Sequence, residues 1–240
     1  MDNKKIYYEY DFSTESAVGI EYEKYLHQSQ SKYQKIDIIK TKYYGNAMYL
    51  DGCFMLSEKN QDYYHEECIK LIPNNAKKIL IIGGGDCAIA KLISKYLSVE
   101  QIDIVEIDKK VVDISKKYFP KHFNYKKDEK MKVNIIIEDG YAYLKASDKK
   151  YNCIIIDSTD PINQAKILVT KKFLKECYKS LTKMGVIIQQ SGSPLKDIKT
   201  IIEPLIKKYK DLGFVNESVI NFSMPLYPTG TWSFISAKRA

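Results

Sequence analysis

The sequence predicts an α/β protein, with a doubly wound parallel sheet that follows a small β-rich amino-terminal domain. From about residue 78 onward, apolar runs alternate with helical stretches. These runs are continuous, as in strands buried on both faces, whereas the residues before 60 show only short strand-and-turn patterns. We therefore expect an amino-terminal β-strand domain at residues 1–60 and a larger α/β domain at residues 61–240.

In the amino-terminal part, the pattern at residues 35–40 and again at 47–50 is that of a strand. Turn residues separate and follow these two segments at Tyr44-Gly45-Asn46 and Leu50-Asp51-Gly52. Further along the chain, strands are expected at about 78–82, 102–106, 132–137, 152–156 and 185–190. Helices are expected between them, near 87–97, 109–117, 140–146, 170–182 and 196–211.

The carboxy-terminal segment departs from this alternation. Residues 215–224 and 231–238 read as two strands joined through Tyr227-Pro228-Thr229-Gly230. Two strands with so short a connection form an antiparallel hairpin, here at the edge of the sheet. The predicted fold is therefore the methyltransferase-type variant of the Rossmann-like fold.

Composition excludes several classes of protein. The chain of 240 residues is long enough for one sizeable core with a small appendage. No apolar run approaches the ~20 residues that span a bilayer, and Met1–Lys5 leads into Tyr and Glu residues rather than an apolar signal core. The five cysteines are scattered without a Cys-x-x-Cys pair, which indicates neither a disulfide framework nor a zinc site. We expect a cytoplasmic protein without a membrane partner.

The formal net charge of +8 raises the question of nucleic-acid binding. The lysines, however, are spread along the chain, many as pairs at the ends of elements, and no Arg-rich or aromatic-interleaved basic motif is present. A lysine-biased composition explains the charge better than a binding surface does. We do not expect a nucleic-acid partner.

A glycine-rich turn and a later acidic residue together indicate a nucleoside pocket. The apolar run at residues 78–82 stops at Gly83-Gly84-Gly85-Asp86, where glycines allow backbone to approach a ligand closely. Glu106 ends the next apolar run, 23 residues after Gly83. This is close to the offset of ~20 residues at which an acidic side chain accepts hydrogen bonds from ribose hydroxyls.

Carboxylates stand at the end of each of four predicted parallel strands. In an open parallel sheet these ends share one edge, where ligands bind. Several unpaired carboxylates in one cleft repel each other unless a cation lies between them. A metal would normally have ligands closer together in sequence or accompanied by His, so a cationic organic substrate such as an amine fits better, and no metal site is assigned. The acids are Asp86, Glu106 with Asp108, Asp139, and Asp157 with Asp160.

Structural roles could also explain some of these acids. Asp86 and Asp108 stand where they could cap helices, and Asp157 and Asp160 could shape a turn before Pro161. Glu106 and Asp139 have no evident role as cap or core residues. We favour a functional role for Asp157, because it follows the fully apolar run at residues 153–156 and would be presented by a rigid strand.

Several motifs of the chain closely resemble the spermidine synthase (polyamine aminopropyltransferase) family, in the family's order from about Tyr22 to Lys238. In the amino-terminal part they are Ser31-Lys32-Tyr33-Gln34, Tyr44-Gly45-Asn46, Leu50-Asp51-Gly52 and Tyr64-His65-Glu66-Glu67. In the α/β part they are Gly83-Gly84-Gly85-Asp86, Val105-Glu106-Ile107-Asp108, Glu138-Asp139-Gly140, Asp157-Ser158-Thr159-Asp160-Pro161, Gln189-Gln190-Ser191-Gly192-Ser193-Pro194 and Tyr227-Pro228-Thr229-Gly230.

The resemblance implies transfer of the aminopropyl group of decarboxylated S-adenosylmethionine to an amine, typically putrescine, giving spermidine and methylthioadenosine. It implies catalysis by Asp157 with Tyr64 at the attacking amine. Glu106 would hold the ribose hydroxyls, Asp139 the adenine amino group and Asp86 the terminal ammonium of the donor. The full donor-binding set would be Gln34, Gly83, Gly85, Asp86, Glu106, Asp139 and Gly140, and the amine-binding set His65, Asp160 and Tyr227. The family habit is a homodimer or homotetramer, and no metal or redox cofactor is implied.

The chain also departs from the family pattern. Met55 replaces a Gln, Cys87-Ala88 replaces two glycines, Asn163-Gln164 replaces a Gly-Pro, and Asn60-Gln61 replaces an acidic pair, while Ala240 ends the chain where many members continue. These changes leave open the preferred amine and the efficiency of the enzyme.

Two alternatives also stay open. One is an S-adenosylmethionine-dependent amine N-methyltransferase, since putrescine methyltransferases share the fold and many of these motifs. The carboxylate of that donor would meet Asp86 unfavourably. The other is a basic protein that binds nucleic acid or keeps only a nucleoside pocket.

Overall fold

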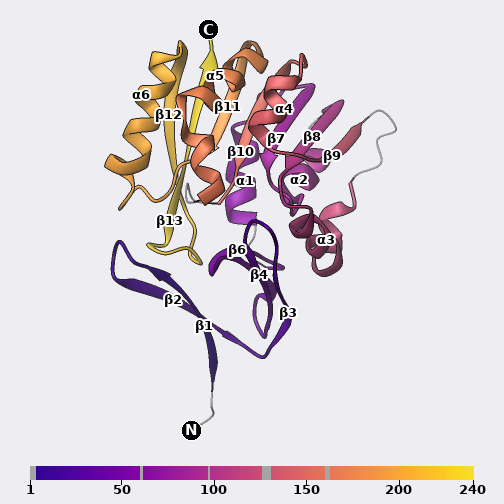
Figure 1. Ribbon diagram of the computed structural model, residues 1–240, viewed down its shortest axis with the longest axis vertical. Coiled ribbons are helices and arrows are strands. Elements are labelled where there is room, and N and C mark those ends of the chain that lie inside the picture. Colours follow the sequence, from indigo (N-terminus) through magenta and orange to yellow (C-terminus); the bar gives the residue numbers. More distant parts are fainter. Residues whose placement is uncertain (1–3, 60–61, 97, 126–130, 160–162) are drawn as a thin grey trace.

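The computed structural model describes residues 4–59, 62–96, 98–125, 131–159 and 163–240 (Figure 1). A seven-stranded sheet in the order β12-β13-β11-β10-β7-β8-β9 forms the centre of the larger part. Its five parallel strands are β7 (Lys78–Gly83), β8 (Gln101–Glu106), β9 (Lys132–Ile137), β10 (Tyr151–Asp157) and β11 (Leu181–Gln190). The antiparallel strands β12 (Phe214–Ser223) and β13 (Thr231–Arg239) complete one edge, so the predicted methyltransferase-type sheet with its edge hairpin is confirmed.

Alternate side chains of the central strands pack against different helices on the two faces of the sheet. Ile79 and Ile81 of β7 belong to the core with α1 (Asp62–Lys70) and α2 (Ala88–Tyr96). Leu80 and Ile82 belong to the opposite core, with the remaining helices of that face. These are α4 (Gly140–Ala146), α5 (Lys171–Ser180) and α6 (Glu203–Asp211), while α3 (Lys109–Tyr118) packs toward the amino-terminal strands. Burial on both faces explains why these strands read as continuous apolar runs.

Two element boundaries differ from the prediction for physical reasons. A helix is predicted from residue 196, but α6 begins at Glu203, with Pro204 in its first turn after a short π-helical turn at Ile198–Ile202. Proline has no N–H to donate to the preceding turn, so it is favoured at a helix start. Likewise α5 ends at Ser180 because Leu181 already pairs with Tyr151 of β10.

The amino-terminal part consists of two small antiparallel sheets. β3 (Lys24–Gln30), β4 (Lys35–Thr41), β5 (Gly45–Leu50) and β6 (Cys53–Ser57) form a four-stranded meander. This confirms the predicted β-rich character and the two strands expected there. A separate hairpin of β1 (Lys5–Asp11) and β2 (Ser16–Tyr22), and helix α1, are additional to the predicted elements. No helix within the described ranges is both long and apolar enough to cross a bilayer.

Two buried acids fix the β1–β2 hairpin to the rest of the molecule. Glu9 accepts a hydrogen bond from the backbone N–H of Phe54 over 2.8 Å, and Asp11 pairs with Lys196 at 2.7 Å. Burial acts to raise the pKa of Asp11, but the bonds from Lys196 and Ser13 outweigh it and lower the pKa to about 2. The hairpin, which lies below the large sheet in Figure 1, is thus held by a carboxylate that stays ionised at neutral pH.

Replacing Lys196 by Met should loosen this hairpin, because it leaves the buried Asp11 carboxylate without its cation. We expect a loss of about 1–3 kcal/mol in local stability, seen as faster amide hydrogen exchange in β1 and β2. Lys171→Met is the matched control, because the ion pair of Lys171 with Asp211 is exposed on both sides. Unchanged exchange in the Lys196 variant would show that the ion pair does not anchor the hairpin.

Candidate active site

A cleft of about 600 Å³ lies at the carboxyl ends of the parallel strands, where they meet the amino-terminal strands. All the residues that the sequence analysis assigns to the site and that the structure describes line this cleft. They are Gln34, Tyr64, His65, Gly83, Gly85, Asp86, Glu106, Asp139, Gly140, Asp157 and Tyr227. Asp160, the remaining assignment, lies outside the described residues. Segments far apart in the chain therefore meet in one cleft, at the edge of the sheet where the carboxyl ends of the parallel strands lie.

The glycine-rich turn allows two acids to approach β7 closely. A Cβ at Gly83, which has a φ of +85°, would lie 2.0 Å from the backbone oxygen of Asp157. A Cβ at Gly85 would lie 2.8 Å from Cγ of Glu106. A side chain at Gly83 would meet backbone, and one at Gly85 would push the Glu106 side chain out of its position, so the glycines bring both acids to the same cleft.

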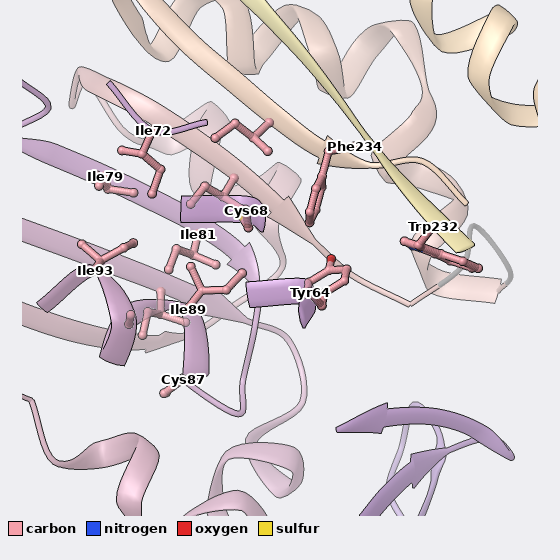
Figure 2. Packing of buried hydrophobic residues seen from close by; sticks show 14 of the residues in the cluster. Tyr64, Cys68, Ile72, Ile79, Ile81, Cys87, Ile89, Ile93, Trp232 and Phe234 are labelled. Carbon is pink, nitrogen blue, oxygen red and sulfur yellow. The ribbon is translucent and has the colours of Figure 1, made fainter. Parts of the chain in front are cut away.

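Asp157, the last residue of β10, is held by a tyrosine from α1. The hydroxyl of Tyr64 donates to Oδ1 of Asp157 over 2.8 Å. The Tyr64 ring is buried, and its centroid lies 4.9 Å from that of Phe234 on β13. In Figure 2, Tyr64 lies beside Phe234 within the packed cluster, and its hydroxyl points to the side of Phe234. Burial and the Asp157 charge both raise the pKa of Tyr64, so it stays a neutral donor.

Two carboxylates of the cleft, Asp157 and Glu106, have raised pKa values. Burial, followed by the negative charge of Asp86, raises the pKa of Asp157 to about 7, although the bond from Tyr64 opposes this. Burial and the charge of Asp108 likewise raise the pKa of Glu106 to about 7. Two acids that would normally be fully ionised are thus partly protonated at neutral pH. A bound cation would reverse this shift.

Asp108 links the two parts of the molecule beside Glu106. Its Oδ1 accepts from the backbone N–H of Lys110 and caps α3, as one of the alternatives predicted. Its Oδ2 accepts from Ser31 over 2.6 Å and from Gln34 over 3.2 Å, and both donors belong to the amino-terminal part. The backbone N–H of Asp108 donates to Glu106 over 2.8 Å. Gln34, which lines the cleft, is therefore held there by its hydrogen bond to Asp108, two residues after Glu106.

Two other acids that line the cleft accept hydrogen bonds from backbone N–H groups at the start of a helix. Oδ1 of Asp139 accepts from the N–H of Ala142 over 2.8 Å, so the expectation that no cap explains this residue is wrong. The residue stands directly before α4, and the unpaired N–H groups of a first turn attract a carboxylate there. Oδ1 of Asp86 similarly accepts from Ala88 at 2.7 Å. A structural role and a place in the cleft are compatible for both side chains.

Comparison with known protein families decides the assignment. Residues 51–240 match the spermine/spermidine synthase domain, and residues 7–58 match the spermidine synthase tetramerisation domain. The chain belongs to the spermine/spermidine synthase family. The family consists of transferases of polyamine biosynthesis, so this protein is an enzyme of that class.

Curated relatives and solved structures of this family resemble the chain over nearly its whole length. The polyamine aminopropyltransferase of Methanocaldococcus jannaschii is 39% identical, over 93% of this chain and 76% of the relative. That of Clostridioides difficile is 37% identical, over 98% and 84%. A spermidine synthase in complex with the transition state analogue AdoDATO superposes with a TM-score of 0.89 at 30% identity, over 99% of this chain and 81% of that one. The spermidine synthase of Thermotoga maritima gives 0.87 at 30%, over 99% and 80%.

Sequence reasoning missed the places of two residues in this synthase-family cleft, Glu9 and Gln190. Glu9 of the hairpin lines it although only 9% of the residue is exposed. Gln190 donates to the backbone oxygen of Ser158 over 3.0 Å and accepts from the indole N–H of Trp232 over 3.1 Å. The alternation of acids with aromatic residues in β1 could have indicated a buried acidic face. Nothing local in the sequence indicates the contacts of Gln190.

Replacing Asp157 by Asn should stabilise the folded, ligand-free protein at high pH. Because the pKa of Asp157 is higher in the folded than in the unfolded chain, the folded state binds more protons between about pH 4 and 7, and stability falls as the pH rises through this window. Asn cannot ionise but can still accept from Tyr64. We expect the variant to gain about 5 °C in melting temperature at pH 8 and little at pH 4, measured by thermal unfolding without ligand.

Glu138→Gln is the control, because Glu138 is an exposed acid in the same chain. A melting temperature of the Asp157→Asn variant that is unchanged or lower at pH 8 would contradict the unfavourable ionisation of Asp157.

Proposed function

We propose that this enzyme transfers the aminopropyl group of decarboxylated S-adenosylmethionine to putrescine, giving spermidine and methylthioadenosine. One observation supports this most strongly: Asp157, bonded to Tyr64, shares a cleft with Asp86 and Glu106, and burial together with the charge of Asp86 raises the pKa values of both Asp157 and Glu106. Such a cleft favours cations, and both proposed substrates are cationic.

The donor would bind along the ends of β7, β8 and β9. Glu106 would accept from the ribose hydroxyls, Asp139 would accept from the adenine amino group, and Gln34 would help to seat the nucleoside. Gly140 lets α4 start close to β7 at this place, because a Cβ there would lie 2.6 Å from Cγ2 of Ile82. Asp86 would hold the terminal ammonium of the aminopropyl group, next to the glycine-rich turn.

The chemical step needs a neutral amine. An alkylamine with a pKa near ~10 is almost entirely ammonium at neutral pH and has no lone pair to donate. Asp157 would accept the proton, with Tyr64 fixing the direction of its carboxylate. The nitrogen then attacks the methylene carbon bonded to the sulfonium, the C–S bond breaks, and its electron pair returns to sulfur as neutral methylthioadenosine leaves. Holding both substrates in line contributes at least as much as the proton transfer.

The charge of Asp86 favours the decarboxylated donor. Ordinary S-adenosylmethionine carries a carboxylate next to its amino group, which would lie near Asp86 and the other acids of the cleft. Methyl transfer is therefore the weaker candidate. That a related spermidine synthase was solved with the transition state analogue AdoDATO agrees with this choice.

A diamine acceptor is supported by an acid on the far wall of the cleft. Phe54 donates its backbone N–H to Glu9, and its ring lies 6.1 Å from that of Tyr227, which in turn lies 6.3 Å from Tyr64. A series of contacts through these three aromatic residues thus connects Glu9 with Asp157, to which Tyr64 donates. A second ammonium could face Glu9 while the first reacts at Asp157. His65 and Asp160 complete the proposed amine site.

The proposed reaction requires no metal or redox cofactor, since the sulfonium already activates the carbon that is attacked. The match of residues 7–58 to a tetramerisation domain supports a homo-oligomer, a dimer or a tetramer.

An end-point assay tests the function. The protein is incubated with decarboxylated S-adenosylmethionine or with S-adenosylmethionine, and with putrescine, cadaverine, diaminopropane, agmatine, spermidine or butylamine. We expect methylthioadenosine and spermidine from putrescine, and little product from butylamine, which lacks the second ammonium. Product from the carboxylated donor alone would assign methyl transfer instead, and preference for another polyamine would change the acceptor only.

Asp157→Asn should lower turnover about 10²–10⁴-fold, because the amide cannot accept the proton of the attacking amine. Donor affinity, measured by calorimetry, should stay close to that of the wild type, and Glu138→Gln should leave turnover unchanged. Near-normal turnover in the Asp157 variant would remove this residue from the proposed role.

A further inference from the structure

A buried histidine outside the cleft contacts the backbone of Asp86. His122 lies in the short 3₁₀ turn Pro120–Phe123 that follows α3, and only 5% of the residue is exposed. Its Nδ1 lies 3.1 Å from the backbone oxygen of Asp86. Because a carbonyl oxygen can only accept, Nδ1 carries the hydrogen. The ring also stacks on Phe119, with centroids 5.7 Å apart and planes 19° apart, which fixes its orientation.

The segment that His122 contacts is conformationally unfavourable. Cys87, directly after Asp86, has a φ of +63°, in the left-handed region that favours glycine. The peptide that bears the Asp86 carbonyl also leads into Cys87, so its orientation sets where the Asp86 side chain points. Tyr125, three residues beyond His122, lies near the Cys87 thiol and interacts with it electrostatically. Residues 119–125 therefore contact the end of the glycine-rich turn, at Asp86 and Cys87, from the side that does not face the cleft.

We propose that His122 is a positioning residue for the donor's aminopropyl group. By donating to the carbonyl of Asp86, it holds this strained peptide in one orientation, while the bond from Ala88 to Oδ1 fixes the carboxylate. The Asp86 side chain is thereby aimed into the cleft before the donor arrives. This inference rests on the proposed function, in which Asp86 receives the terminal ammonium of the donor.

The affinities of the protein for two nucleosides distinguish this positioning role of His122 from a role in packing alone. Decarboxylated S-adenosylmethionine carries the ammonium that Asp86 would hold, whereas methylthioadenosine has the same nucleoside without the aminopropyl group. Damage to the nucleoside pocket or the fold would weaken both ligands. Misplacement of Asp86 would weaken only the donor.

The test compares His122→Phe, which keeps a stacking ring without the donor hydrogen, with His122→Asn, whose amide can place an N–H near the position of Nδ1. Binding of both nucleosides is measured by calorimetry, and KM and kcat with putrescine are measured in parallel. For His122→Phe we expect donor affinity to fall about tenfold or more, with a matching rise in the donor KM, and methylthioadenosine affinity to change less than about twofold. His122→Asn should restore most of the donor affinity. Lys121→Gln, an exposed change in the same turn, is the control.

Equal weakening of both nucleosides in His122→Phe would overturn the proposal and leave a packing role. Unchanged donor affinity in that variant would overturn it as well, provided that the wild type binds the donor more tightly than methylthioadenosine. If the wild type shows no such preference, the role of Asp86 in the proposed function fails, and the inference fails with it.

Discussion

The repulsion among carboxylates at the ends of neighbouring parallel strands is the constraint on which the rest of this structure depends. Asp86, Glu106 and Asp157 end up in one cleft because parallel strands present their carboxyl ends at a single edge. Burial and the charges of neighbouring carboxylates, chiefly Asp108 beside Glu106 and Asp86 beside Asp157, raise the pKa values of Glu106 and Asp157 to about 7. In the ligand-free protein the ionised forms of these buried acids are therefore unfavourable, and a cationic ligand would stabilise them. The folded state is thus less stable because of the groups that bind the ligand.

The surrounding elements hold these acids in place despite that cost. Glycines at 83 and 85 let the backbone of β10 and the side chain of Glu106 approach β7. Tyr64 holds Asp157 from α1, and Asp108 joins the amino-terminal part to the end of β8 through Ser31 and Gln34. Each contact comes from a different segment of the chain, which explains why the cleft requires both parts of the molecule.

Sequence alone predicted the features that follow from local pattern. The parallel strands carry mostly apolar residues because both faces of the sheet are buried, and the glycine-rich turn and the acids that end β8 and β10 stand at fixed places relative to them. The β1–β2 hairpin was not predicted, since its burial depends on contacts as distant as that of Asp11 with Lys196. The sequence did not predict that Asp139 caps a helix, because β9 ends only two residues before it and α4 begins directly after it. The same position is therefore both the end of a strand and the start of a helix. The roles of Glu9 and Gln190 likewise depend on residues far away in the sequence.

Proton release on donor binding tests the central claim most directly. Decarboxylated S-adenosylmethionine would be titrated into the protein at pH 7 by calorimetry, in two buffers that differ in ionisation enthalpy. If the acids of the empty cleft share protons, a bound cation must lower their pKa values, and a fraction of a proton up to about one per site should be released. Proton uptake, or a binding enthalpy independent of the buffer, would contradict the account.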